Sequence, residues 1–204
     1  MIRLAQNGRL WTITIDRPEK ANSLTLGMLE EIDRIVALAG AEGAGAVVLT
    51  GAGRVFSAGA DLDEARAGLA TNGIWERLSA RIAGLPCLTI AALNGTLAGG
   101  AFGMALACDL RIAVPEAKFF YPVMKLGFLP QRSDPARMSA LIGPARAKLI
   151  LMAGQKIAAA EALTWGLLDR IVAPEALLDE ATALAADVCA AEPQHAAAIK
   201  ALFR

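Results

Sequence analysis

The segment IAALNGTLAGGAFGMALACDLRIA, residues 90–113, runs from an apolar stretch through a turn of small residues into a second apolar stretch. No acid or base appears in it before Asp109. The apolar stretch from Leu88 to Gly95 predicts a buried strand, and a helix is expected from about Gly100 to Ala107. Small residues in the intervening turn allow a ligand to approach the main chain closely. The segment therefore predicts a strand, a loop that offers backbone groups, and a helix.

The same order of elements occurs earlier in the chain. AVVLTG, residues 46–51, predicts a buried strand, and AGRVFSAGAD follows it as a loop interrupted by glycines. Asp61 is expected to cap the next helix, with Glu64 three residues further on. Both loops follow the carboxyl end of a strand, where α/β sheets bind ligands. Either the glycines only permit tight turns, or the loops offer two free N–H groups that form an oxyanion hole.

The remaining elements also indicate an α/β fold. Alternating residues predict a strand over Leu10–Pro18, and a helix capped by Ser23 or Thr25 is expected to end at Gly40. We assign residues 1–172 to the core and residues 173–204 to a helical arm, in which the spacing of Leu177, Leu178, Leu184 and Val188 predicts one packed face. Further helices are expected over about 74–83, 135–143, 144–154, 159–167 and 175–203, and short strands over 109–114, 118–122 and 167–172.

Composition argues against several classes of function. Twenty positive and twenty negative side chains balance, so we expect neither a nucleic-acid nor a membrane partner. No run of apolar residues has the length of a membrane span, about 20 residues. Three separated cysteines favour a cytoplasmic protein, and a single histidine argues against a metal site or a histidine triad. The glycine loops lack the third glycine of the dinucleotide fingerprint and the lysine of a P-loop.

Five stretches resemble, in order and spacing, the crotonase superfamily, which is also called the enoyl-CoA hydratase/isomerase family. They extend over about residues 13–172, and the resemblance rests on several ordered motifs. The stretches are TIDRPEKANSLT (14–25), VVLTGAGRVFSAGADL (47–62), the opening segment 90–113, KLGFLP (125–130) and GQKIAAAEALTWGLLDRIV (154–172).

This resemblance implies a spiral of ββα repeats with a shortened helical C-terminal part, assembled as a homotrimer or a dimer of trimers. It also implies an acyl-CoA substrate, whose thioester carbonyl would lie between the backbone N–H groups of Ala60 and Gly100. Coenzyme A would enter as part of the substrate, so no separate cofactor is expected. The carbonyl of Ala58 would meet the adenine amino group. The candidate substrate-binding residues are Arg54, Ala58, Gly59, Asp61, Leu62, Arg66, Gly99 and Val123.

The sequence departs from the pattern of the water-adding members of this family. Those members hold a water molecule with two glutamates, and the matching positions here are Gly103 and Val123. The only carboxylates between residues 84 and 130 are Asp109, expected to be structural, and Glu116, expected in a solvated turn. Because a general base contributes about 10²–10⁴-fold to a rate, simple hydration is disfavoured. An isomerase, decarboxylase or thioester hydrolase fits better.

Two polar residues follow Pro130 and are the remaining candidate catalytic side chains. Gln131 can donate or accept a hydrogen bond but cannot act as a base at neutral pH. Asp134 acts as a base if the loop turns it inward. The alternative is a solvated loop in which Asp134 caps the helix behind Pro135.

Three other polar residues are weaker candidates for a role in the site. Tyr121 either orients a substrate or fills the core beside Phe119 and Phe120. Lys125 and His195 are expected at the surface.

Since relatives usually continue beyond the point where this chain stops, the resemblance leaves three possibilities: a more open site, a site completed by a partner subunit, or a weakened site. The alternatives to an enzyme of altered reaction are a catalytically silent acyl-CoA-binding subunit and a true hydratase with a substitute base.

Overall fold

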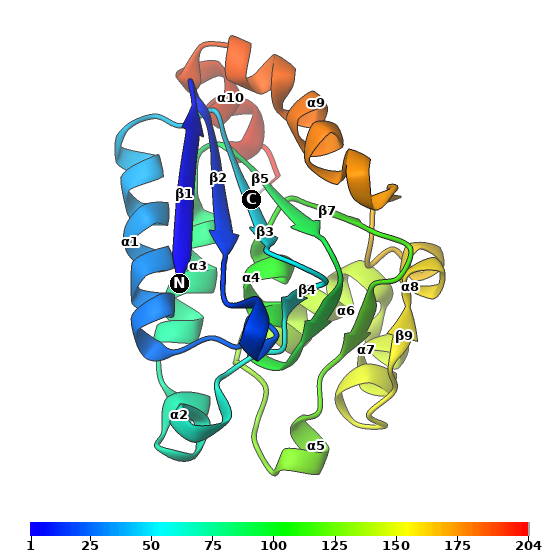
Figure 1. Ribbon diagram of the computed structural model, residues 1–204. Coiled ribbons are helices and arrows are strands. Elements are labelled where there is room, and N and C mark those ends of the chain that lie inside the picture. Colours follow the sequence, from blue (N-terminus) through cyan, green and yellow to red (C-terminus); the bar gives the residue numbers. More distant parts are fainter. Residues whose placement is uncertain (204) are drawn as a thin grey trace.

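The computed structural model describes residues 1–203 as an α/β fold built around two β-sheets (Figure 1). The larger sheet has six strands in the order β1-β2-β3-β5-β7-β10. All neighbouring strands in it are parallel except β1 and β2. Its strands are β1 (Ile2–Asn7), β2 (Leu10–Ile15), β3 (Ala46–Gly51), β5 (Leu88–Leu93), β7 (Leu110–Ala113) and β10 (Arg170–Ile171).

A smaller sheet has the order β4-β6-β8-β9. Along the chain, β3, β5 and β7 of the large sheet are each followed by a strand of the small sheet and then by a helix. This repetition confirms the expected ββα arrangement. The three- and two-residue strands β8 and β10 lie within predicted strands, whereas β4, β6 and β9 were not predicted, because strands this short carry little alternation. The small sheet consists of β4 (Val55–Ser57), β6 (Thr96–Ala98), β8 (Lys118–Phe120) and β9 (Ile157–Ala158).

Helices cover the sheets at the expected places, apart from the short helix Val123–Leu126, which was not predicted. Thr25 rather than Ser23 caps α1, because its hydroxyl accepts a hydrogen bond from the Met28 amide at 3.3 Å. None of the helices within residues 1–203 is both long and apolar enough to cross a bilayer. The helices of the first 172 residues are α1 (Leu26–Ala41), α2 (Leu62–Arg66), α3 (Ile74–Gly84), α4 (Phe102–Ala107), α5 (Val123–Leu126), α6 (Asp134–Ile142), α7 (Pro144–Leu151) and α8 (Ala159–Trp165).

The C-terminal arm packs onto the rest of the chain as expected, but two details of the prediction were wrong: the helix expected over 175–203 is divided into two, and Leu178 does not lie on the packed face. It consists of α9 (Leu177–Ala190) and α10 (Pro193–Ala201), and the proline begins the second helix. Leu177 lies in the common hydrophobic core, whereas Leu178 is 48% exposed. The buried stripe of α9 continues through the alanines at 181 and 185, which are too small to stand out in the sequence.

Candidate active site

Two loops meet at the carboxyl ends of β3 and β5, where α2 and α5 also lie (Figure 1). Their short strands β4 and β6 pair in parallel. A Cβ atom on Gly59 would lie 3.0 Å from the Ala98 carbonyl oxygen and 3.3 Å from the Gly100 nitrogen. Gly59 has φ +94° and Gly99 has φ +56°, a region that side chains disfavour. Backbone conformation and close contact therefore both require glycine at residue 59.

Asn22 fixes the shape of the first loop from outside it. Its buried side chain donates to the carbonyls of Ala52 (2.9 Å) and Val55 (2.6 Å) and accepts from the Arg17 amide (2.8 Å). The Ser57 hydroxyl in turn donates to the Asn22 carbonyl at 2.7 Å. No sequence pattern indicated this role, because an asparagine in a polar stretch is typical of any exposed turn.

Replacing this side chain should destabilise the protein. In Asn22→Ala the Ala52 carbonyl and the Arg17 amide lose partners at a buried position, so the free energy of unfolding should fall by about 3 kcal/mol. Urea unfolding measures the change. Asn7→Ala, at an exposed position of β1, is the matched control and should differ from wild type by less than about 0.5 kcal/mol. Equal losses in the two variants would contradict this account of the loop.

Each loop contains, next to the other loop, an amide that has no hydrogen-bond partner within residues 1–203. The amide of Leu24 donates to the Gly59 carbonyl, and the Asp61 amide donates to the Leu24 carbonyl, both at 2.8 Å. The Ala60 amide between these groups faces the other way, because backbone groups alternate along an extended strand. Gly100 lies in the first turn of the short 3₁₀ helix Gly99–Ala101, where amides have no partner within the helix. Within residues 1–203, neither the Ala60 nor the Gly100 amide donates a hydrogen bond.

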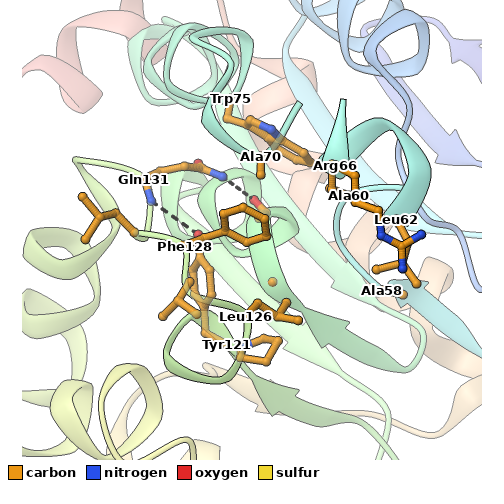
Figure 2. Close-up of a pocket in the computed structure, with 16 residues that line it drawn as sticks. Ala58, Ala60, Leu62, Arg66, Ala70, Trp75, Tyr121, Leu126, Phe128 and Gln131 are labelled. Atoms are coloured by element: carbon orange, nitrogen blue, oxygen red, sulfur yellow. Dashed lines mark hydrogen bonds between the residues drawn. The ribbon is translucent and has the colours of Figure 1, made fainter. Parts of the chain in front are cut away.

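A largely apolar pocket of about 300 Å³ lies beside these two amides (Figure 2). It contains eight of the twelve candidate site residues, namely Ala58, Ala60, Leu62, Arg66, Gly99, Gly100, Val123 and Gln131. Tyr121, which the sequence offered as a residue that orients a substrate, also lines the pocket. The remaining lining residues were not recognised from the sequence as parts of a binding site: Ala65, Ala70, Trp75, Pro122, Leu126, Phe128 and Leu129.

The other four candidate residues lie outside the pocket lining. Gly59 is buried between the loops, Arg54 is exposed, and Asp134 is buried behind the wall. Asp61 caps α2 through the amides of residues 63 and 64, and its carboxylate also pairs with Arg17 at 2.8 Å. The hydrogen bond from Arg17 lowers the pKa of Asp61. The position of Asp61 therefore serves the loop rather than the pocket.

Trp75 forms the wall opposite Gly100. A Cβ atom on Gly100 would lie 3.3 Å from the indole ring and 3.1 Å from Nε2 of Gln131. The indole nitrogen donates to the Leu69 carbonyl at 2.8 Å, which holds the ring in place. Helical spacing within α3 predicts only a core residue here, so the sequence carried no sign of this role.

Gln131 occupies the space above Gly103. Its Nε2 donates to the Gly100 carbonyl at 2.8 Å, and its Oε1 overlaps the position that a Cβ atom on Gly103 would take. Oδ1 of Asp134 lies 3.1 Å from that same position. Within residues 1–203, neither oxygen has a hydrogen-bond partner. A side chain at residue 103 would therefore have to displace Gln131.

Asp134 is turned inward, so of the two alternatives considered for it the solvated capping residue was wrong. Its side chain is fully buried and its Oδ2 accepts a hydrogen bond from the Tyr121 hydroxyl at 3.0 Å. Burial raises the pKa of Asp134 to about 7, although the Tyr121 hydrogen bond and the charge of Arg137 oppose this increase. Glu76 adds to it. A carboxyl group that titrates near neutral pH and lies behind a pocket wall is suited to proton transfer.

Tyr121 fills the core, as one alternative expected, and it also lines the pocket, which is the position that the other alternative requires. The ring packs in the core against Phe102, with 5.5 Å between centroids, and the same residue lines the pocket. Burial, followed by the charge of Asp134, raises the pKa of Tyr121 above its usual range. Tyr121 therefore reaches the pocket as a neutral phenol.

The more distant polar residues lie where the sequence indicated. Lys125, Glu116 and His195 are exposed. Asp109 accepts hydrogen bonds from Thr89 and from Lys200 of α10, so it joins the arm to the sheet. Within the part of the chain that the structure describes, His, Cys, Asp and Glu side chains form no group that could hold a metal ion.

The ββα spiral, with a pocket between two glycine loops at the carboxyl ends of parallel strands, defines an α/β protein of the crotonase class. Residues 5–204 match the family model described as enoyl-CoA hydratase/isomerase. The chain belongs to the enoyl-CoA hydratase/isomerase family, the crotonase superfamily of acyl-CoA-binding enzymes.

Individual relatives are similar over nearly the whole chain. The probable enoyl-CoA hydratase echA6 of Mycobacterium bovis is 36% identical over 96% of this chain and 80% of its own length. The carnitinyl-CoA dehydratase of Salmonella arizonae is 35% identical over 100% of this chain and 80% of its own. The crystal structure of an enoyl-CoA hydratase from Bacillus anthracis superposes with a TM-score of 0.91 at 32% identity, covering 99% of this chain and 81% of that one.

Proposed function

We propose that the protein binds an acyl-CoA thioester with the carbonyl oxygen between the N–H groups of Ala60 and Gly100. The observation that carries this proposal is the pair of unbonded amides on two touching loops beside one apolar pocket. Two fixed donors stabilise the negative charge that develops on that oxygen when the thioester becomes an enolate, because they need no reorganisation during the reaction. The apolar walls strengthen the interaction by excluding water.

The side chains around the pocket favour a reaction other than simple hydration. Val123 lines the pocket and carries no acid or base. Gly103 has none either, and Gln131 fills the space that a side chain there would need. The acid–base group closest behind the wall is Asp134, while Gln131 orients the Gly100 peptide. Isomerisation, decarboxylation and thioester hydrolysis therefore fit this chain better than hydration does.

A second candidate is a true enoyl-CoA hydratase in which Asp134 replaces the missing glutamates. The observation in its favour is that several similar proteins are named as hydratases or probable hydratases. Oε1 of Gln131 and Oδ1 of Asp134, both without partners, also approach one point above Gly103.

Calorimetric titration followed by a panel of assays distinguishes these candidates. We expect butyryl-CoA and octanoyl-CoA to bind at one site per chain, and free coenzyme A to bind less tightly. Absence of any acyl-CoA affinity would remove the proposal. With enoyl-, 3-enoyl-, malonyl- and saturated acyl-CoA substrates, we expect turnover in isomerisation, decarboxylation or thioester hydrolysis. Hydration of crotonyl-CoA that is lost in Asp134→Asn would favour the second candidate instead.

A further inference from the structure

Tyr121 and Asp134 form a buried pair that thioester binding itself does not require. The phenol comes from the segment after β8 and the carboxylate from the first residue of α6, so tertiary packing alone brings them together. The Tyr121 side chain is 3% exposed and that of Asp134 is fully buried, yet only Tyr121 belongs to the pocket wall. Oδ1 of Asp134 has no partner within residues 1–203. A half-satisfied buried carboxylate is costly and calls for a functional explanation.

A hydrogen bond connects the two residues, with the donor Tyr121 at the pocket and the acceptor Asp134 in the interior. Tyr121 donates its hydroxyl hydrogen to Oδ2 of Asp134 at 3.0 Å. The backbone N–H of Gln131 donates to the phenol oxygen over a long distance of 3.5 Å. The phenol oxygen can therefore still accept a hydrogen bond from another group. Figure 2 shows Gln131 contacting this oxygen with its backbone nitrogen and the Gly100 carbonyl with its side chain, so one residue connects the phenol to the second glycine loop.

We propose that Tyr121 is the catalytic residue that removes the proton from the α-carbon of the bound acyl group, and that Asp134 acts through it as the proton acceptor. This inference rests on the proposed function, because it needs the thioester in the pocket. The α-C–H bond breaks and its proton passes to the phenol oxygen, while the phenol's own proton passes to Oδ2 of Asp134. The electron pair moves to the thioester oxygen, and the resulting enolate is held by the Ala60 and Gly100 amides. Reversal returns the proton to carbon.

The surroundings of Asp134 suit this exchange. Arg137 on its own helix and Glu76 on α3 are the charged groups that act on it, with opposite effects on its pKa. Helix α4, which contributes Gly103 to the same space, has no titratable side chain between Phe102 and Ala107. With a pKa of about 7, Asp134 is partly ionised at neutral pH and can both take and return a proton. Gln131 and Arg66, the other polar side chains of the pocket wall, cannot accept one.

Exchange of α-hydrogens in D2O tests the relay apart from binding. Butyryl-CoA has no double bond to hydrate or move, so deuterium incorporation at its α-carbon, followed by mass spectrometry, reports proton removal alone. We expect Tyr121→Phe and Asp134→Asn each to slow incorporation by roughly 100-fold or more. Calorimetric affinity for butyryl-CoA should change by less than about threefold, because the phenyl ring and its packing on Phe102 remain. Lys125→Met, at an exposed position of α5 outside the pocket lining, is the control and should exchange at the wild-type rate.

The pH profile adds a readout that a merely structural role would not change. Wild-type exchange should rise with pH and level off above about 7, because the ionised form of Asp134 is required. This step should be absent from Asp134→Asn. Wild-type exchange rates in Tyr121→Phe, or binding of butyryl-CoA to the wild type without exchange, would overturn the relay while leaving the proposed function intact. Failure of the wild type to bind butyryl-CoA at all would remove both.

Discussion

Gly100→Val should reduce kcat/KM for an acyl-CoA substrate by about 10²–10³-fold, the cost of removing one donor of an oxyanion hole. A Cβ atom at this residue would already lie 3.1 Å from Nε2 of Gln131 and 3.3 Å from the Trp75 ring. The two further methyl groups of valine would have to enter the space in front of the amide. The carbonyl of the substrate could then no longer reach the nitrogen.

Gly27→Val is the matched control for this substitution. Gly27 is exposed in the first turn of α1, and a Cβ atom there would meet no atom within 4 Å. Its kcat/KM should stay within about twofold of wild type, because the change alters only helix propensity, by less than about 1 kcal/mol and in favour of the helix. Kinetics and calorimetry on both variants give the comparison. Unimpaired turnover in Gly100→Val would show that this amide does not act on the substrate.

Asp134→Asn should remove a large pH dependence from the stability of the protein. The folded protein holds the pKa of this carboxyl at about 7, against an ordinary value of 3.8. Between these pH values the folded state binds the proton more tightly than the unfolded state does. The contribution is therefore fully present below about pH 4 and is lost as pH rises through 7, a change of about 4 kcal/mol.

Urea unfolding of wild type and Asp134→Asn at intervals from pH 4 to pH 8 measures this contribution. The wild-type free energy of unfolding should fall relative to that of the variant across this range. Asp63→Asn is the control, because that carboxylate is 92% exposed and should leave the pH profile unchanged. Parallel pH profiles for wild type and Asp134→Asn would mean that Asp134 titrates as an ordinary carboxyl.

Much of the fold could be predicted from local pattern. The apolar run Ala46–Gly51 and the periodic helix that Thr25 caps both lie within one or two residues of their expected bounds, because long regular patterns report burial directly. The sequence also predicts the two glycine loops and shows the motifs that resemble the crotonase superfamily. The resemblance to this family predicts Ala60 and Gly100 as the two donors.

The rest of the site depends on contacts between distant segments. Nothing in QRSDP (131–135) distinguishes a solvated loop from one that buries Asp134. Burial of Asp134 depends on its hydrogen bond with Tyr121 and on the absence of a side chain at Gly103. Trp75 follows helical spacing like any core residue, although it faces Gly100. Residues whose roles arise only from tertiary packing leave no periodic trace in the chain.

The central claim is that the Ala60 and Gly100 amides both donate hydrogen bonds to the same thioester oxygen. A crystal structure of the protein with bound butyryl-CoA tests it most directly. We expect the thioester oxygen to lie within about 2.7–3.2 Å of both nitrogens, with the acyl chain in the pocket beside Tyr121. A thioester oxygen bonded to neither amide, in a fully occupied complex, would contradict the account.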